Sequence, residues 1–520
     1  MLKLKTLQFA YNADGELFSA NTTKSLHTDD VTLTVRTEGD VFSASVHALH
    51  EIRIERLRAV FECELGESDR IFLNGYQSWT DSQEHTIHDK LHGLDHLPKG
   101  IVQKYAFNRY GDYDFVNYDK RSGHLHGWSY GYVRTGPIFR FMGSLSEDCG
   151  FTLLRTDAHK QELIVEKDCR DLHLLGDFDG LQLLLTEGNE KEVFDRYFEL
   201  LGIRLRPEAK PIFGYTSWYR HYQNITSDII REDLEGLLSQ HEKADVFQID
   251  DGYQTAVGDW LSVDADKFPD GMAQVASEIR DAGMLPGIWM APFACEEKSE
   301  IFQHHKDWLL TDENGYSVKG GSNWSGFYAL DIYNENVRSY LREVFRTVTQ
   351  EWGYKLLKLD FLFGACLEPH DGMNRGELMA DALDLLRESV AEGTWFDLCG
   401  VPLTSAFGRT EFCRIGCDVG LDWDDVPYMR LLHRERVSTK RSLANTIGRS
   451  HLDGVVFRND PDVFFLRSDV KLTDAQRSRL LHADATLGGV FFTSDDASLW
   501  DDGQRTAFDD ALDTFVRRNG

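Results

Sequence analysis

The sequence predicts an α/β fold, a (β/α)8 TIM barrel preceded by an N-terminal antiparallel β-sandwich domain. Three observations support this prediction. The chain has 520 residues, more than one hydrophobic core usually serves. Its first part alternates apolar and polar residues, whereas the part after Pro211 alternates short apolar runs with amphipathic stretches. We therefore expect two domains, residues 1–205 with a linker helix and residues 206–520.

Period-two alternation predicts the strands of the N-terminal domain. Val31, Leu33 and Val35 alternate with polar residues, Gly39-Asp40 turns the chain, and alternation resumes over residues 42–48. Similar runs cover residues 130–134, 161–165 and 181–186. A sandwich in which each sheet has one solvated face explains this pattern. Residues 191–201 carry one apolar stripe and are expected to form the linker helix.

Short apolar runs after Pro211 predict about eight parallel strands. They are residues 212–218, 245–251, 285–293, 354–361, 395–400, 412–418, 455–460 and 490–495. Helical patterns between them are clearest over residues 234–240, 272–280, 337–351, 377–390 and 475–487. A doubly wound open sheet is the competing architecture, but no glycine-rich phosphate loop follows the first strand. A closed barrel is the better interpretation.

Composition narrows the class of partner. The chain has 56 Lys and Arg against 86 Asp and Glu, a net charge of −30, which repels nucleic acid and anionic membranes and favours a neutral ligand. No apolar run approaches the roughly 20 residues of a membrane helix, and the start of the chain does not resemble a signal peptide. The eight cysteines are scattered without a CxxC pair, as expected for a reduced cytoplasmic protein. The sequence leaves open whether the chain forms a homo-oligomer.

Reactive side chains follow most of the predicted barrel strands, at the end where barrel enzymes place their active sites. In strand order these are Trp218 with Tyr219, Asp250 with Asp251, Trp289, Lys358 with Asp360, Asp397 with Cys399, and Arg414 with Asp418. Any one strand-end aspartate is more often a helix cap or an ion-pair partner. Several unpaired charges at one end of a packed barrel are costly unless they serve a ligand, so the set predicts a functional site.

Asp360 and Asp418 supply the two carboxyl groups that glycoside hydrolysis requires. Lys358 and Asp360 point to the same face of a strand, so we expect the ammonium beside the carboxylate, favouring the ionised form of a nucleophile. A buried structural ion pair is the alternative. Asp418 would act as the acid, and we expect Arg414 to face the sugar instead of contacting Asp418.

The remaining candidates fit recognition of a sugar. Asp250-Asp251 could instead be a metal site, but a divalent ion would want further ligands nearby. Carboxylates that accept hydrogen bonds from a diol are the better fit. Trp218 and Trp289 offer flat apolar faces for a sugar ring, and their alternative is barrel core.

Nine short strings carry a family resemblance. In chain order they are Asn74-Gly-Tyr-Gln-Ser-Trp79, Trp218-Tyr219, Phe247-Gln-Ile-Asp-Asp-Gly252, Gly258-Asp-Trp260, Pro286-Gly-Ile-Trp-Met-Ala-Pro-Phe293, Lys358-Leu-Asp-Phe361, Cys399-Gly-Val-Pro-Leu403, Arg414-Ile-Gly-Cys-Asp418 and Asn459-Asp-Pro-Asp462. Together they resemble glycoside hydrolase family 36, the α-galactosidases. The resemblance implies a retaining mechanism on terminal α-D-galactosyl groups, without cofactor or metal. It also implies Asp360 as nucleophile and Asp418 as acid/base, about 5–5.5 Å apart.

The resemblance also implies roles for the other residues. Asp250 and Asp251 match ligands of O4 and O6, and Lys358 matches a ligand of O3 and O4. The other matches are Arg414 and Cys399 near O2, Trp218 and Trp289 at the pocket walls, and Trp79 at the rim, contributed by the N-terminal domain. Tyr219, beside Trp218, is a further candidate for substrate binding.

The sequence departs from the family pattern near the acid. Cys417 stands where many relatives have proline, and an acidic loop, residues 420–425, follows Asp418. Asp422 is therefore a second, lower-ranked acid candidate. The chain ends after a helical pattern over residues 506–518, which leaves no room for the C-terminal β domain that relatives usually carry.

The resulting hypothesis is a retaining, exo-acting α-galactosidase that hydrolyses small galactosides. Within the enzyme class, α-N-acetylgalactosaminidase and α-galactosyl transglycosylase activities remain as alternatives. From a different class, the chain would be a sugar-binding protein without turnover.

Overall fold

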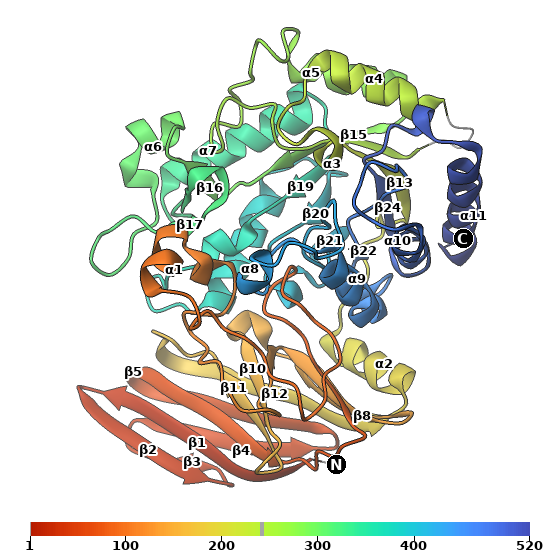
Figure 1. The fold of residues 1–520 in the computed structure, drawn as a ribbon. Coiled ribbons are helices and arrows are strands. Elements are labelled where there is room, and N and C mark those ends of the chain that lie inside the picture. Colours follow the sequence, from red (N-terminus) through yellow and green to blue (C-terminus); the bar gives the residue numbers. More distant parts are fainter. Residues whose placement is uncertain (1, 240–243, 520) are drawn as a thin grey trace.

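The computed structural model describes residues 2–239 and 244–519. It contains an antiparallel sheet built from the first part of the chain and a parallel sheet surrounded by helices built from the rest (Figure 1). The antiparallel sheet lies at the bottom of the view, and the parallel sheet lies above it. The change from alternating to helical periodicity near Pro211 therefore marks a real change of architecture.

Twelve strands form the antiparallel sheet within the described residues. They are β1 (Lys3–Ala13), β2 (Glu16–Thr22), β3 (Leu26–His27), β4 (Val31–Glu38), β5 (Val41–Glu62), β6 (Arg70–Leu73), β7 (His126–Trp128), β8 (Tyr130–Thr135), β9 (Ile138–Ser144), β10 (Thr152–Asp157), β11 (Glu162–Lys167) and β12 (His173–Gly188). The prediction of antiparallel strands is confirmed, including the runs at residues 130–134, 161–165 and 181–186.

The long strand β5 joins what the sequence suggested would be two sheets. Its 22 residues pair with β4 and β12 in their first half and with β1 and β11 in their second half. All twelve strands therefore belong to one hydrogen-bonded sheet. Buried side chains from these strands, among them Leu7, Phe42 and Leu183, form an apolar core of their own.

The parallel sheet contains every strand that the sequence predicted after Pro211. Its strands are β13 (Ile212–Thr216), β14 (Val246–Ile249), β15 (Leu285–Met290), β19 (Leu356–Leu359), β20 (Trp395–Leu398), β21 (Phe412–Arg414), β22 (Arg458–Asp460), β23 (Val463–Phe464) and β24 (Val490–Thr493). Their order is β22-β21-β20-β19-β15-β14-β13-β24-β23. Only Pro461 and Asp462 separate β22 from β23 at the two ends of this order, so the sheet curves back on itself as in a TIM-like barrel.

Helices follow most strands of the parallel sheet, and α5 and α10 pack directly on it. They are α3 (Trp218–His221), α4 (Ser227–Leu238), α5 (Gly271–Asp281), α6 (Glu300–His304), α7 (Glu335–Arg346), α8 (Arg375–Glu388), α9 (Thr439–Gly448), α10 (Asp474–Leu487) and α11 (Asp502–Asn519). The predicted helices are confirmed, with residues 347–351 continuing α7 as a π-helix. Residue 240, the last of one predicted helix, lies outside the described residues.

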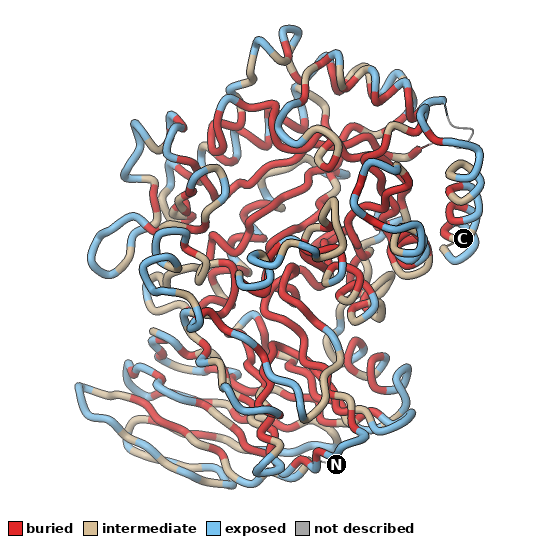
Figure 2. The backbone as a smooth tube through the Cα atoms, viewed as in Figure 1, coloured by how far each residue is buried: buried red, intermediate tan, exposed pale blue. Residues whose placement is uncertain are grey.

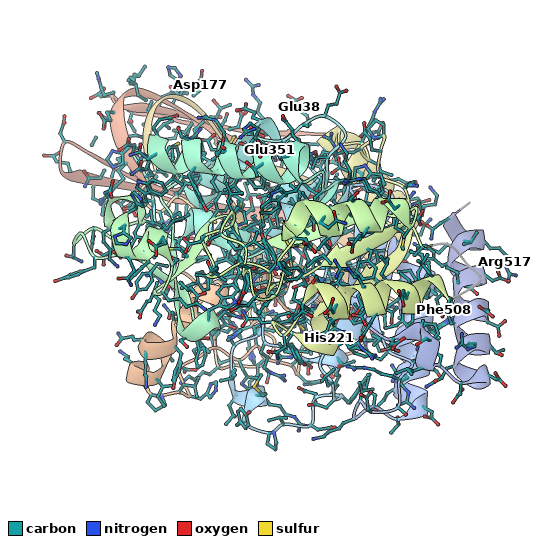
Figure 3. All side chains as sticks on the ribbon, turned by 90° about the horizontal axis from the view of Figure 1, so that it is seen from above. Glu38, Asp177, His221, Glu351, Phe508 and Arg517 are labelled. Carbon is teal, nitrogen blue, oxygen red and sulfur yellow. The ribbon has the colours of Figure 1, made fainter. Side chains whose placement is uncertain are left out.

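Amphipathic faces hold these helices to the sheet. On α11, Phe508 is 1% exposed and packs on Phe491 of β24 with ring centroids 6.4 Å apart, whereas Arg517 points away and is exposed. Figure 3 shows both side chains on this helix. Burial of a large aromatic side chain contributes about 1.5–3 kcal/mol, so such contacts are enough to fix a terminal helix.

Two further helices and a small sheet lie outside these two parts of the fold. The helix α1 (Lys99–Tyr105) precedes β7, the predicted linker helix appears as α2 (Glu190–Leu201), and β16 (Ala294–Glu296), β17 (Lys319–Gly321) and β18 (Phe327–Ala329) form a small sheet of their own. The capping box of Asn189 and Glu192 starts α2. No helix in the described part of the chain is both long and apolar enough to cross a membrane.

The segment around Asn74–Trp79 fastens the N-terminal part to the barrel. Ser78 donates its backbone N–H to Val401 O at 2.9 Å and accepts the N–H of Gly400 on its hydroxyl at 2.9 Å. Arg449, 0% exposed, donates to the side chain of Asn74 and to the carbonyl of Ser78. Figure 2 shows buried backbone continuing from one part into the other. The N-terminal segment therefore reaches the strand ends of the barrel.

Candidate active site

A cavity of about 240 Å³ lies at the carboxyl ends of the parallel strands. Most of the predicted site residues line it: Trp79, Trp218, Asp250, Asp251, Trp289, Lys358, Asp360 and Asp418. Tyr219, Cys399 and Arg414 do not line it but contact residues close to the cavity. The strand-end side chains therefore meet in one place, as their position in the sequence predicted.

Asp360 is held in a fixed orientation immediately after β19. Trp289 donates its indole N–H to Oδ2 of Asp360 at 3.0 Å, and the backbone N–H of Phe361 donates to Oδ1 at 2.9 Å. Phe361 adopts a left-handed conformation with φ of 55°, which turns its amide back onto the carboxylate. Burial raises the pKa of Asp360, and the ammonium of Lys358 opposes this rise.

The expected contact between Lys358 and Asp360 is not the one that forms. Lys358 Nζ instead donates to Oδ2 of Asp250 at 2.9 Å, and both side chains are buried. Lys358 and Asp250 come from strands separated only by β15, and both side chains point inward. Lys358 thus acts on Asp360 through its charge and on Asp250 through a hydrogen bond.

The two carboxylates of the Asp250-Asp251 pair have separate surroundings. Besides Lys358, Asp250 Oδ2 accepts from Gln248 at 3.1 Å. Asp251 Oδ2 accepts from the indole N–H of Trp324 and from Gln223, both at 2.8 Å. Burial raises the pKa of Asp251, and the Trp324 hydrogen bond opposes this rise. Within the described residues, no group of three or more His, Cys, Asp or Glu side chains is arranged to hold a metal ion.

The prediction that Arg414 would stay clear of Asp418 is wrong. Arg414 Nη1 lies 2.8 Å from Oδ1 of Asp418. The predicted strand over residues 412–418 ends earlier, at Arg414, so the side-chain alternation of a strand does not extend to Asp418. Asp418 lies on the following loop, and its side chain is 36% exposed.

Arg414 is shared by three carboxylates. Its other nitrogens lie 2.8 Å from Asp460, the last residue of β22, and 3.0 Å from Asp462, which follows Pro461. Asp462 also accepts hydrogen bonds from the hydroxyl of Tyr219 and from the N–H of Val419 at 2.9 Å. Burial raises the pKa of Asp462 to about 7.

The N-terminal part supplies one wall of the cavity. Trp79 donates its indole N–H to the sulfur of Cys399 at 3.1 Å and packs against the ring of Phe361. Tyr110 stacks on His433 with ring centroids 4.4 Å apart and nearly parallel planes. Both aromatic residues line the cavity. The prediction that Trp79 reaches the site from the N-terminal part agrees with this geometry.

Several lining residues were not predicted from the sequence. They are Phe107, Tyr110, Ser322, Asn323, Trp324, Phe361, Met429, Leu432, His433, Glu435, Arg436 and Val437. Trp324 carried one usable signal, since it lies beside Asn323 and Gly326 in a glycine-rich segment between predicted elements. Asp422, the second acid candidate, is not among the lining residues and accepts the N–H of Asp425 at 2.9 Å.

Comparison with known proteins gives a consistent result. Residues 198–364 match the family model described as Melibiase. The α-galactosidase of Escherichia coli is 28% identical over 219 residues, which are 40% of this chain and 29% of that protein. The α-galactosidase AgaA of Geobacillus stearothermophilus is 28% identical over 107 residues, 19% of this chain and 14% of that protein. The chain thus matches less than a third of the length of these curated relatives.

Solved structures match over a greater length. TtGalA, the α-galactosidase from Thermus thermophilus, was solved in complex with stachyose, and it aligns with a TM-score of 0.75 and 26% identity. This alignment covers 94% of this chain and 99% of that one. The GH36 α-galactosidase AgaA from Geobacillus stearothermophilus aligns with a TM-score of 0.62 at 14% identity, covering 94% and 67% of the two chains; it shows the shared fold.

The fold and these comparisons identify the class of protein as a glycoside hydrolase. Within that class, the chain is similar to α-galactosidases, among them members of glycoside hydrolase family 36. The family resemblance of the sequence motifs is confirmed by these matches.

Proposed function

We propose that this chain is a retaining, exo-acting α-galactosidase that removes terminal α-D-galactosyl groups from small galactosides by double displacement. The observation that carries the proposal is the joint lining of one cavity by Asp360 and Asp418. We assign residues 1–205 to an N-terminal domain and residues 206–520 to a catalytic (β/α)8 barrel. The likeness to TtGalA, solved with stachyose and with p-nitrophenyl α-D-galactopyranoside, supports the substrate class.

Asp360 is the nucleophile of the proposed mechanism. Its carboxylate oxygen attacks C1 of the galactosyl group while the bond from C1 to the leaving oxygen breaks, which gives a β-galactosyl ester. The hydrogen bonds from Trp289 and Phe361 fix the carboxylate before attack. The charge of Lys358 favours its ionised form.

Asp418 is the acid and then the base. It gives its proton to the leaving oxygen in the first step, and in the second step it takes a proton from the water that attacks C1 of the ester. The two displacements return the α configuration. The partial exposure of Asp418 supports this role, because the incoming water and the departing group both need access to it.

Recognition of galactose is assigned to the polar cavity residues near the ends of β14 and β19. The carboxylates of Asp250 and Asp251 would accept hydrogen bonds from the sugar hydroxyls, including the axial O4, and the ammonium of Lys358 would donate hydrogen bonds to them. Trp218 and Trp289 supply apolar surface against the ring. A volume of about 240 Å³ is below the ~300–1,000 Å³ of larger ligand sites, which supports binding of one sugar unit at a chain end.

The O2 side of the sugar supports a galactoside over an N-acetylgalactosaminide. The resemblance implies Cys399 and Arg414 at this position. Cys399 is 1% exposed and Trp79 covers it, so a bulky N-acetyl group would have to displace packed side chains.

The proposal is tested with p-nitrophenyl α-galactoside and NMR analysis of the first product. The wild type should release α-galactose before mutarotation. Asp360→Ala should lose turnover and regain it with azide as β-galactosyl azide, whereas Asp422→Ala, a matched acid outside the cavity, should keep activity. Release of β-galactose would contradict the retaining mechanism. Galactosyl transfer would give oligosaccharide products, and binding without turnover by the wild type would indicate a sugar-binding protein.

A further inference from the structure

The segment that follows Asp418 forms the cavity wall beside this residue. It leaves the strand ends at Val419 and returns at Ser438, whose N–H donates to the backbone carbonyl of Asp418 at 2.9 Å. Met429, Leu432 and Val437 from this segment line the cavity. Apolar side chains thus lie at the same end of the site as Asp418.

The N-terminal part adds aromatic surface to the same wall. Phe107 packs on His433 with ring centroids 5.7 Å apart, and Tyr110 stacks on the same ring. The hydroxyl of Tyr110 donates to Asn323. His96 contacts the backbone carbonyl of Leu431 at 2.7 Å, which joins the two segments of the wall.

The charged groups of this wall are already bound within the protein. Arg436 donates to both carboxylate oxygens of Asp424 at 2.7 and 3.1 Å, and its side chain is 2% exposed. Glu435 accepts from the hydroxyl of Thr80 at 2.8 Å and from that of Tyr113 at 2.9 Å. Asp424 of the acidic loop is thus paired with Arg436, and no residue of that loop, residues 420–425, is among the lining residues.

Apolar surface continues from the cavity to the outside. Val437 is 43% exposed and Leu431 on the same segment is 54% exposed. On α1, Ile101 and Tyr105 are 43% and 42% exposed, and Tyr105 stacks on Phe107 at 5.4 Å. An exposed apolar surface that is continuous with a ligand cavity usually has a binding role.

We propose that the leaving-group side of this site binds an apolar aglycone instead of a second sugar ring. The inference rests on the proposed function, because the acid must lie within hydrogen-bond reach of the glycosidic oxygen. The leaving group then extends past Asp418 over the wall that Met429, Leu432 and Val437 form. A second sugar would leave hydroxyl groups without partners against this wall, whereas an alkyl chain would lose contact with water there.

The test compares methyl α-D-galactoside, octyl α-D-galactoside below its micellar concentration, and melibiose. Their leaving groups are all alcohols of the alkyl type, so the comparison isolates binding of the aglycone. Each methylene that leaves water is worth about a fourfold gain. We expect kcat/KM for the octyl compound to exceed that for the methyl compound and for melibiose by about tenfold or more. Calorimetry on the Asp360→Ala variant should give the same order of Kd.

A paired substitution locates the effect. Leu432→Asn with Val437→Thr should lower the octyl-to-methyl ratio of kcat/KM severalfold. Leu175→Asn, at a 70% exposed position of β12 outside the cavity, should leave both the ratio and the activity unchanged.

The outcomes separate this inference from the proposed function. Equal kcat/KM or Kd for the methyl and octyl compounds, or a preference for melibiose, would overturn the apolar aglycone site in the wild type itself. If no galactoside were hydrolysed but octyl galactoside still bound more tightly than methyl galactoside, the proposed function would fail and the apolar site would stand.

Discussion

The buried pair of Lys358 and Asp250 gives a quantitative prediction. The ammonium and the carboxylate are 2.9 Å apart, and their side chains are 6% and 3% exposed. At an effective dielectric constant of 20, their attraction is about 6 kcal/mol, most of which offsets the cost of removing both charges from water. Lys358→Met or Asp250→Asn alone should destabilise the fold by about 3–5 kcal/mol, because each leaves one buried charge without its partner.

The double variant should lose much less than the two single variants together, since it leaves neither charge unpaired. For unfolding of the barrel or of the whole chain, 3–5 kcal/mol corresponds to a fall of roughly 3–8 °C in the thermal midpoint. The assay is far-UV circular dichroism during heating of all four proteins at one pH and scan rate. Losses that simply add in the double variant would refute the idea that the unpaired charge causes the destabilisation.

Three further predictions concern the same cavity. Lys358→Met should move the acid limb of the kcat/KM pH profile for p-nitrophenyl α-galactoside to higher pH. The ammonium of Lys358 lowers the pKa of Asp360, and the proposed nucleophile must be ionised. An acid limb at the same pH in the variant would count against this. Trp324→Phe keeps an aromatic ring but removes the hydrogen bond to Asp251, so kcat/KM should fall about 10- to 100-fold. A change of less than about twofold in steady-state kinetics would contradict a role of this hydrogen bond in activity. Arg414→Gln removes the cation that three carboxylates share, so it should lower the thermal midpoint more than Lys358→Met does. An equal or smaller loss in the same heating experiment would show that the carboxylates do not depend on the guanidinium.

The sequence predicted those parts of the fold whose packing is apolar and local. Parallel strands between helices are buried on both faces, so each appears as a short apolar run, and every such run after Pro211 became a strand. The helix α9 was not predicted because its buried positions are largely polar. Ser442, Asn445 and Thr446 lie inside, where Asn445 accepts the N–H of Ser82 at 2.7 Å, so a test for apolar periodicity fails there.

The residue pattern predicted the site where its residues end a strand, and the family resemblance added Trp79, which reaches the site from a loop. The other loop residues of the cavity were not predicted. The alternation of side chains and the direction of the strands bring Asp250, Trp289 and Asp360 to one end of the sheet. Tyr110 comes from the N-terminal part and Trp324 from the segment between β17 and β18. Their positions depend on tertiary contacts that no local pattern encodes.

The ion pairs of the site differ from those that the sequence predicted within single strands. A single sequence suggests pairs within one strand, whereas the inward-facing groups of neighbouring strands form a common set in the barrel. One guanidinium, that of Arg414, serves Asp418, Asp460 and Asp462, so the carboxylates outnumber the cation that they contact. Burial raises the pKa of Asp462 to about 7, and the charge of Arg414 opposes this rise. Arg414 therefore does not serve Asp418 alone, and its hydrogen bond to Asp418, which the sequence did not predict, orients that side chain.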